Sequence, residues 1–344
     1  MYAAGVTSTP DQAAREARRA HLRAEYARAL RPAIEALSSE QASLMAGMMP
    51  GLVLGLVGWG TAIALLVRHP WPDTWWGDPA SWQVVGLAVL LVLGVRRAAH
   101  WLDGGRAARF KASADTFERD VLPRVFATLR PRASYKKGAA VDRGWIRRSA
   151  LVPGANEYGC RHLVKWSTGG IRVQMARVDA AEVTTQRDGD TTRISVVRGV
   201  VAIATMPVQV PGHVRVGRRD TDQLGLEPLP GHKDVTPAML SRVPGSAPPA
   251  WLHDDYVATT DSAAVAALVL TPDVIGVLNA LREQGRSVRL AVAHGEVFLV
   301  LERWAAWFGD LAGRLDEDRY VEMGEFMDAV DTIALAVTAR MTAP

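Results

Sequence analysis

Hydrophobic residues are unevenly distributed along the chain, and two long uncharged runs lie near its beginning. Residues 44–67 form 24 consecutive positions without a charge, and residues 79–95 form another 17. A helix needs about 20 apolar residues to cross the hydrocarbon core of a membrane. The second run is short on this scale, but residues 96–102 extend it into the interface. The pattern predicts transmembrane helices over 44–67 and 79–102, joined by an external loop over 68–78. Two buried helices of a soluble fold are the disfavoured alternative, since uncharged runs of this length are rare there.

Amphipathic helices are predicted on both sides of these runs. The segment 1–43 opens with Thr9-Pro10-Asp11-Gln12, a capping box with proline at the first helical position. Its apolar stripe is Leu22, Tyr26, Leu30, Ile34 and Leu37. Pro32 marks a break in this helix. The segment 103–135 carries a second stripe, Phe110, Phe117, Val121, Val125 and Leu129, with Pro123 as its weak point. We expect the two stripes to pack together; one helix lying flat on lipid is the alternative.

Strand-like alternation replaces the helical period after residue 135. The predicted strands cover residues 161–166, 171–178, 183–187, 191–197 and 200–206. Gly169-Gly170 and Asp188-Gly189 are typical of tight hairpin turns between them. The expected result is an antiparallel meander of about five strands.

The second half of this region mixes helices and strands. A proline-rich insertion spans 207–252, with one strand at 214–218. Asp261 is expected to cap a short helix, and Thr271-Pro272 begins another that Gly285 ends. His294-Gly295 joins two strands, 287–293 and 296–302, and a helix over 323–337 closes the chain. Residues 136–344 are therefore predicted to form one α+β domain with a mainly antiparallel sheet.

Charge gives the predicted membrane segments an orientation. The 344 residues carry a net charge of +4, but residues 96–150 hold 14 Lys and Arg against 5 Asp and Glu. Six arginines precede the first run, whereas the loop between the runs holds one. Positive residues stay on the cytoplasmic side. The sequence thus predicts a bacterial inner-membrane protein whose N-terminus and C-terminal domain are cytoplasmic. The single cysteine allows no internal disulfide.

Basic residues directly after the second run are expected to contact anionic lipid headgroups. They are Arg96, Arg97, Arg106, Arg109 and Lys111. Nucleic acid is not an expected partner, because no aromatic-basic recognition motif accompanies this charge.

Three glycines at a spacing of four lie in the first run, Gly47, Gly51 and Gly55. Such a row lets another helix backbone approach closely. Packing against the second predicted helix is the favoured interpretation, and a seam between two copies of the chain is the alternative.

Catalytic chemistry is weakly represented in the sequence. No phosphate-binding loop, dinucleotide fingerprint, HExxH or GxSxG pattern occurs, and no cofactor is predicted. The best candidate site is His253-Asp254-Asp255, which His232 and Asp234 could join in a metal site. A solvated loop is the favoured interpretation of these residues. Cys160 with His162 is a weaker nucleophile candidate, since it lacks a third group. An acidic stretch over 310–328 is expected to be solvated or to attract a basic partner, the 96–150 block included.

The order of features resembles a bacterial membrane-protein family known as domain of unknown function 3137. The resemblance is carried by residues 157–182, 197–201 and 256–281, with Leu270-Thr271-Pro272 opening a helix. The hairpin over 288–300, the paired runs and the basic helix after them agree, so the resemblance covers most of the chain from about Leu44. Because the family has no established activity, it implies a topology and no mechanism.

The sequence thus favours a membrane-anchored binding or scaffold protein without enzymatic activity. Its expected partners are the bilayer, anionic headgroups, and a protein or a second copy of the chain. The alternative is a metal-dependent or other enzyme acting on a membrane-associated substrate, with His253, Asp254 and Asp255 as its site.

Overall fold

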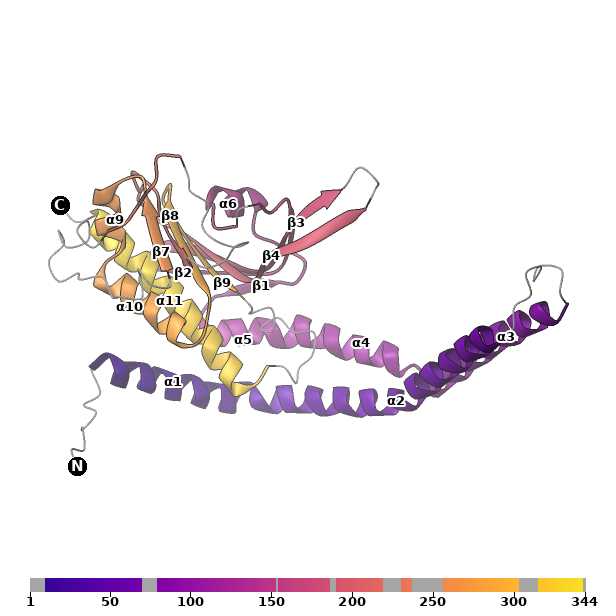
Figure 1. The fold of residues 1–344 in the computed structure, drawn as a ribbon. Helices are drawn as coiled ribbons and strands as arrows, with labels where there is room; N and C mark the ends of the chain where they lie inside the picture. Colours follow the sequence, from indigo (N-terminus) through magenta and orange to yellow (C-terminus); the bar gives the residue numbers. More distant parts are fainter. Residues whose placement is uncertain are drawn as a thin grey trace, which may run out of the picture. The chain divides into compact units, whose positions relative to one another are not determined.

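The chain folds into two compact units in the computed structural model, which describes residues 10–69, 79–152, 154–185, 190–218, 230–236, 256–302 and 315–342. The first, the hairpin unit, contains residues 32–118 and 310–313. The second, the sheet unit, contains residues 1–31, 119–309 and 314–344. Figure 1 gives the element labels used below, and each unit is described by itself.

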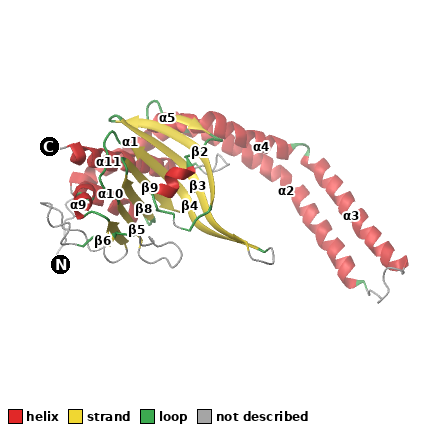
Figure 2. Cartoon of the chain, turned by 90° about the horizontal axis from the view of Figure 1, so that it is seen from above, coloured by secondary structure: helices red, strands yellow, loops and turns green. Residues whose placement is uncertain are grey.

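The hairpin unit consists of helices. They are α2 (Arg31–Arg68), α3 (Pro79–Asp103) and α4 (Arg106–Thr116). Two described helices are long and apolar enough to cross a membrane, α2 and residues 79–98 of α3. Figure 2 shows α2 and α3 side by side as a hairpin. With 38 residues α2 is about 57 Å long at 1.5 Å per residue, so it extends well beyond the uncharged run.

Prolines mark the helix irregularities that the sequence predicts. Helix α1 (Pro10–Ala29) ends just before α2 begins, and Pro32 occupies the first turn of α2, where its missing N–H is tolerated. After α4, a π-helical turn over Phe117–Val121 precedes α5 (Leu122–Leu129). Pro123 lies at the start of α5. Both predicted breaks are confirmed.

Nine strands form one sheet within the described part of the sheet unit. They are β1 (Ser134–Lys136), β2 (Glu157–Thr168), β3 (Ile171–Thr185), β4 (Thr191–Thr205), β5 (Val214–Arg218), β6 (Lys233–Asp234), β7 (Tyr256–Thr260), β8 (Val288–Ala293) and β9 (Glu296–Glu302). The spatial order is β1-β2-β3-β4-β9-β8-β5-β7-β6, and neighbouring strands are antiparallel.

Helices cover both faces of this sheet. On one face α9 (Ala263–Val269) and α10 (Pro272–Glu283) lie beside the long α11 (Glu317–Thr342), as Figure 1 shows. The indole N–H of Trp166 on β2 donates to Asp331 of α11 at 2.8 Å. On the other face, Ile146 of α6 (Arg143–Arg148) and Leu151 pack with Phe298 in an apolar core. The predicted α+β class, with an N-terminal helical hairpin, is confirmed.

Local turn chemistry agrees with several predicted connections. Gly169 and Gly170, with φ of 52° and 80°, join β2 to β3, and His294 and Gly295, with φ of 52° and 77°, join β8 to β9. Thr271 caps α10 by accepting a hydrogen bond from the Val274 N–H.

Three predictions need correction. The meander has three long strands, β2 to β4, where five shorter ones were expected. Gly199 lies inside β4 and does not end a strand. A Cβ at this position would collide with the carbonyl oxygen of Leu301, so glycine is needed for the close pairing of β4 with β9. Ser262, not Asp261, caps α9. The last helix, α11, is longer than predicted at both ends.

Candidate functional site

Large apolar side chains cover the outside of the α2–α3 hairpin. Leu56 is 75% exposed and Val67 is 76% exposed. This apolar belt comprises Met45, Met49, Leu52, Val53, Leu56, Val57, Trp59, Ile63, Val67, Trp82, Leu87, Val89, Leu90 and Leu93. Elsewhere in the described chain, only Ile194, Leu268 and Leu335 are exposed large hydrophobics. So large a contiguous apolar surface marks an interaction with lipid or protein.

Small residues line the inner side of the hairpin. A Cβ at Gly58 would lie 2.5 Å from a methyl carbon of Val95, so only glycine fits this contact between α2 and α3. Ala62, Ser81 and Ala88 are also buried. Small residues allow helices to approach closely in a membrane. Sequence reasoning missed Gly58, although it follows Gly51 at the seven-residue spacing of a coiled-coil seam.

The predicted glycine row is divided among different surroundings. Gly51 is buried, whereas a Cβ at Gly55 would meet no atom within 4 Å. A Cβ at Gly47 would lie 2.6 Å from the Nε atom of Arg106. The three glycines therefore do not share one contact in the hairpin unit.

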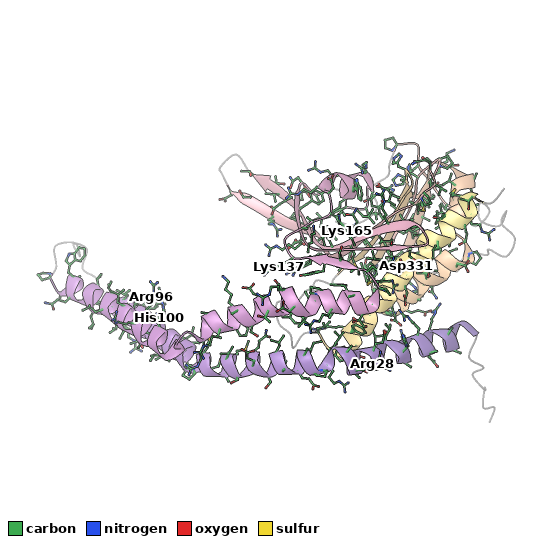
Figure 3. All side chains as sticks on the ribbon, turned by 180° about the vertical axis from the view of Figure 1, so that it is seen from behind. Arg28, Arg96, His100, Lys137, Lys165 and Asp331 are labelled. Carbon is green, nitrogen blue, oxygen red and sulfur yellow. The ribbon has the colours of Figure 1, made fainter. Side chains whose placement is uncertain are left out.

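Most of the predicted lipid-contacting cations are exposed. Arg96, Arg97, Arg109 and Lys111 are open to solvent, and none forms an ion pair with another described residue. Arg106 is half-buried beside Gly47. Figure 3 shows Arg96 and His100 on α3.

The acidic stretch finds partners on α1 and on Arg31, the first residue of α2. Arg18 donates to Asp328 at 2.8 Å, Arg19 pairs with Glu325, and Arg31 donates to Glu317 at 2.7 Å. Of the basic 96–150 block, Arg130 pairs with Asp328 at 2.6 Å and with Asp331 at 2.8 Å. Burial raises the pKa of Asp331, while the hydrogen bond from Trp166 and the charge of Arg130 oppose that rise. Within the sheet unit, these ion pairs link α11 to α1 and to Arg130 at the end of α5.

Apolar packing accompanies these ion pairs. A Cβ at Gly324 of α11 would lie 2.8 Å from Leu22 of α1 and 3.1 Å from Leu129 of α5. The rings of Tyr26 and Tyr320 lie 5.6 Å apart. Within the sheet unit, the α1 and α5 stripes therefore meet on α11.

Cys160 and His162 do not form a catalytic pair. His162 lies at a β-bulge with φ of 62°. The bulge breaks the regular alternation that would put the side chains of residues 160 and 162 on one face of a strand. The Nδ1 atom of His162 lies 2.7 Å from the Tyr135 hydroxyl. Burial raises the pKa of the Cys160 thiol, although the nearby charge of Arg143 lowers it. The thiol is therefore not activated as a nucleophile.

His253, Asp254 and Asp255 lie outside the described residues. Of their suggested neighbours, His232 precedes β6, whose Lys233 pairs with Thr260 at the end of β7. Among the described residues, no group of three His, Cys, Asp or Glu side chains is arranged to hold a metal ion.

Two buried arginines form a polar centre that sequence reasoning missed. Arg215 of β5 and Arg289 of β8 donate to the carbonyl oxygens of Ala150 and Leu151 at 3.3 and 2.6 Å. Arg289 also pairs with Glu302 at 2.5 Å. Ala150 has a φ of 51°, so the two arginines donate hydrogen bonds to a turn with a strained backbone. Arginine in an otherwise apolar strand was the available sequence signal.

Comparison with known proteins does not identify a family for this chain. No family model matches the chain, and neither does any curated protein. A crystal structure of the mycobacterial trehalose monomycolate transport factor A, TtfA, is similar with a TM-score of 0.33 and 8% identity, covering 62% of this chain and 97% of that chain. Similarity at this level does not establish a shared fold.

Proposed function

We propose that the chain is a membrane-anchored binding or scaffold protein of a bacterial inner membrane, without enzymatic activity of its own. The apolar belt on α2 and α3 is the observation that carries the proposal. Exposing this apolar surface to water costs free energy, whereas contact with lipid acyl chains does not. We keep the resemblance to domain of unknown function 3137 as part of the proposal, since it implies the same paired spans.

The proposed orientation places both ends of the hairpin and the sheet unit in the cytoplasm. Six arginines precede residue 44, and the basic block follows residue 95. In the loop over 68–78, Arg68 is the single Lys or Arg residue. The positive-inside rule favours this arrangement. The exposed Arg96, Arg97, Arg109 and Lys111 would then meet the anionic headgroups of the inner leaflet.

Membrane extraction tests the anchor. The full chain should stay in the pellet after washing at alkaline pH and in high salt, because its retention depends on apolar burial. Replacing Leu56 and Leu90 by lysine should release it, since a charge at the helix centre costs about 3 kcal/mol. Leu268→Lys is the matched control, because Leu268 is an exposed leucine of the sheet unit. Release of the unaltered chain by salt alone would refute the anchor.

Cysteine labelling tests the orientation. Cys160→Ser removes the only native thiol, and single cysteines can then be placed at Gly77 in the loop and at Thr338 in α11. An impermeant maleimide added to intact spheroplasts should label Gly77→Cys and should label Thr338→Cys only after lysis. Labelling of Thr338→Cys before lysis would reverse the topology.

A further inference from the structure

Two histidines and one aspartate lie at one end of strands β5, β7 and β6 of the sheet. Val214 of β5 and Lys233 of β6 both pair with Thr260, from opposite sides of β7. His213 and His232 directly precede β5 and β6, so the same register puts both of them opposite Asp261, which follows Thr260. The three residues are therefore neighbours at this end of the sheet.

The imidazole rings of His213 and His232 contact each other. Their centroids lie 5.1 Å apart, and the ring planes meet at 88°. The Nε2 atom of His213 and the Nδ1 atom of His232 are both buried, and neither has a hydrogen-bond partner among the described residues. Buried polar atoms without partners are rare and need an explanation, such as an ion or a water molecule. Here two such atoms come from adjacent rings.

We propose that His213 and His232 are the protein ligands of a site for a transition-metal ion of the zinc class. Imidazole nitrogen is a preferred ligand of Zn²⁺ and Cu²⁺. Two protein ligands leave coordination positions for water or for an exchangeable ligand. No third His, Cys, Asp or Glu side chain among the described residues completes the set.

The charges around the pair suit neutral imidazoles. Burial, with His232 and Arg215 nearby, lowers the pKa of His213 to about 4. Burial and Arg215 likewise lower the pKa of His232. Protons then compete little with a metal for the ring nitrogens at neutral pH. Asp261 supplies negative charge that offsets Arg215. Its Oδ1 atom accepts a hydrogen bond from the backbone N–H of His213 at 2.8 Å.

Zinc titration of the tag-free full chain in nanodiscs tests the site. The unaltered chain should bind one Zn²⁺ by calorimetry, and His213→Gln and His232→Gln should each weaken binding. Loss of an outer-shell partner already costs about 10- to 100-fold in metal affinity, so loss of a ligand should cost at least that much. His21→Ala on α1 and His253→Ala should leave binding unchanged. Binding that survives both glutamine variants, or that His253→Ala abolishes, would overturn the proposal.

Spectroscopy on the unaltered chain gives a readout that needs no variant to fold. With Cu²⁺ as the probe, electron paramagnetic resonance should show two coordinated imidazole nitrogens. A spectrum with one or none, or the absence of any binding at micromolar metal, would refute the site. The anchor proposal is separate, because membrane extraction does not depend on metal.

Discussion

Apolar side chains of the same type occupy opposite environments in the two units. Leu56 of the hairpin unit is 75% exposed, whereas Leu299 of the sheet unit is fully buried. The sheet unit hides its apolar surface among its own elements, as a protein in water does. The hairpin unit instead hides small residues and displays large ones, as expected where lipid is the solvent. The comparison teaches that hydrophobic character predicts burial only once the solvent is known.

Truncation of a buried aromatic side chain should cause the largest loss of stability in the sheet unit. Phe298→Ala should lower the free energy of unfolding of the sheet unit by about 3–5 kcal/mol, because it leaves a cavity in the apolar core. Leu56→Ala should change it by less than about 0.5 kcal/mol, since lipid can fill the space. Denaturant titration in nanodiscs measures both. A similar loss in the two variants would contradict the division into differently solvated units.

A close approach of backbone to backbone should give the next largest effect. Gly199→Ala should destabilise the sheet unit by about 1–3 kcal/mol, because the new Cβ collides with the Leu301 carbonyl. Gly276→Ala in α10 is the control, since its Cβ meets nothing within 4 Å. It should stabilise the helix by about 0.5–1 kcal/mol. Thermal unfolding of both variants checks the pair.

Acid should lower the free energy of unfolding of the sheet unit, because His213 becomes protonated more readily in the unfolded chain. The apolar belt contains no titratable side chain and should not respond to pH. Because the pKa of His213 falls from 6.5 to about 4 on folding, the unfolded chain binds more protons between these values. Stability present above pH 6.5 should therefore decrease as the pH falls toward 4, by roughly 2 kcal/mol because solvent around the partly exposed ring screens the full effect. His213→Gln should flatten this slope in unfolding titrations at several pH values. An unchanged slope would contradict the assigned burial.

Removal of single cations near the hairpin should have the smallest effect. Each basic residue near an anionic surface contributes about 1 kcal/mol. Arg97→Gln should therefore reduce the preference for anionic over zwitterionic lipid about fivefold, measured by lipid retention in nanodiscs. Arg198→Gln, an exposed arginine of β4, should leave the preference unchanged.

Local patterns predicted much of the fold because turns and helix starts depend on neighbouring residues. Gly169-Gly170, His294-Gly295 and Thr271-Pro272 all act where the sequence predicts. Strand limits were harder, because Gly199 interrupts the pattern but not the strand. Its role depends on Leu301, which lies a hundred residues away.

The candidate site was less predictable for the same reason. The apolar belt follows from the two uncharged runs, but Gly58 as the contact of α2 with Val95 requires the packed hairpin. The partners of the acidic stretch on α1 lie some 300 residues away in sequence.

The sequence by itself determined which segments are apolar enough to cross a membrane, where the turns at Gly169-Gly170 and His294-Gly295 lie, and that a sheet follows. The predicted turn at Asp188-Gly189 lies outside the described residues. These properties come from length, period and local backbone preference. Only the tertiary structure decided that His213 meets His232, and that Arg215 and Arg289 converge on one turn. The physical reason is strand register, since it joins residues that no local pattern connects.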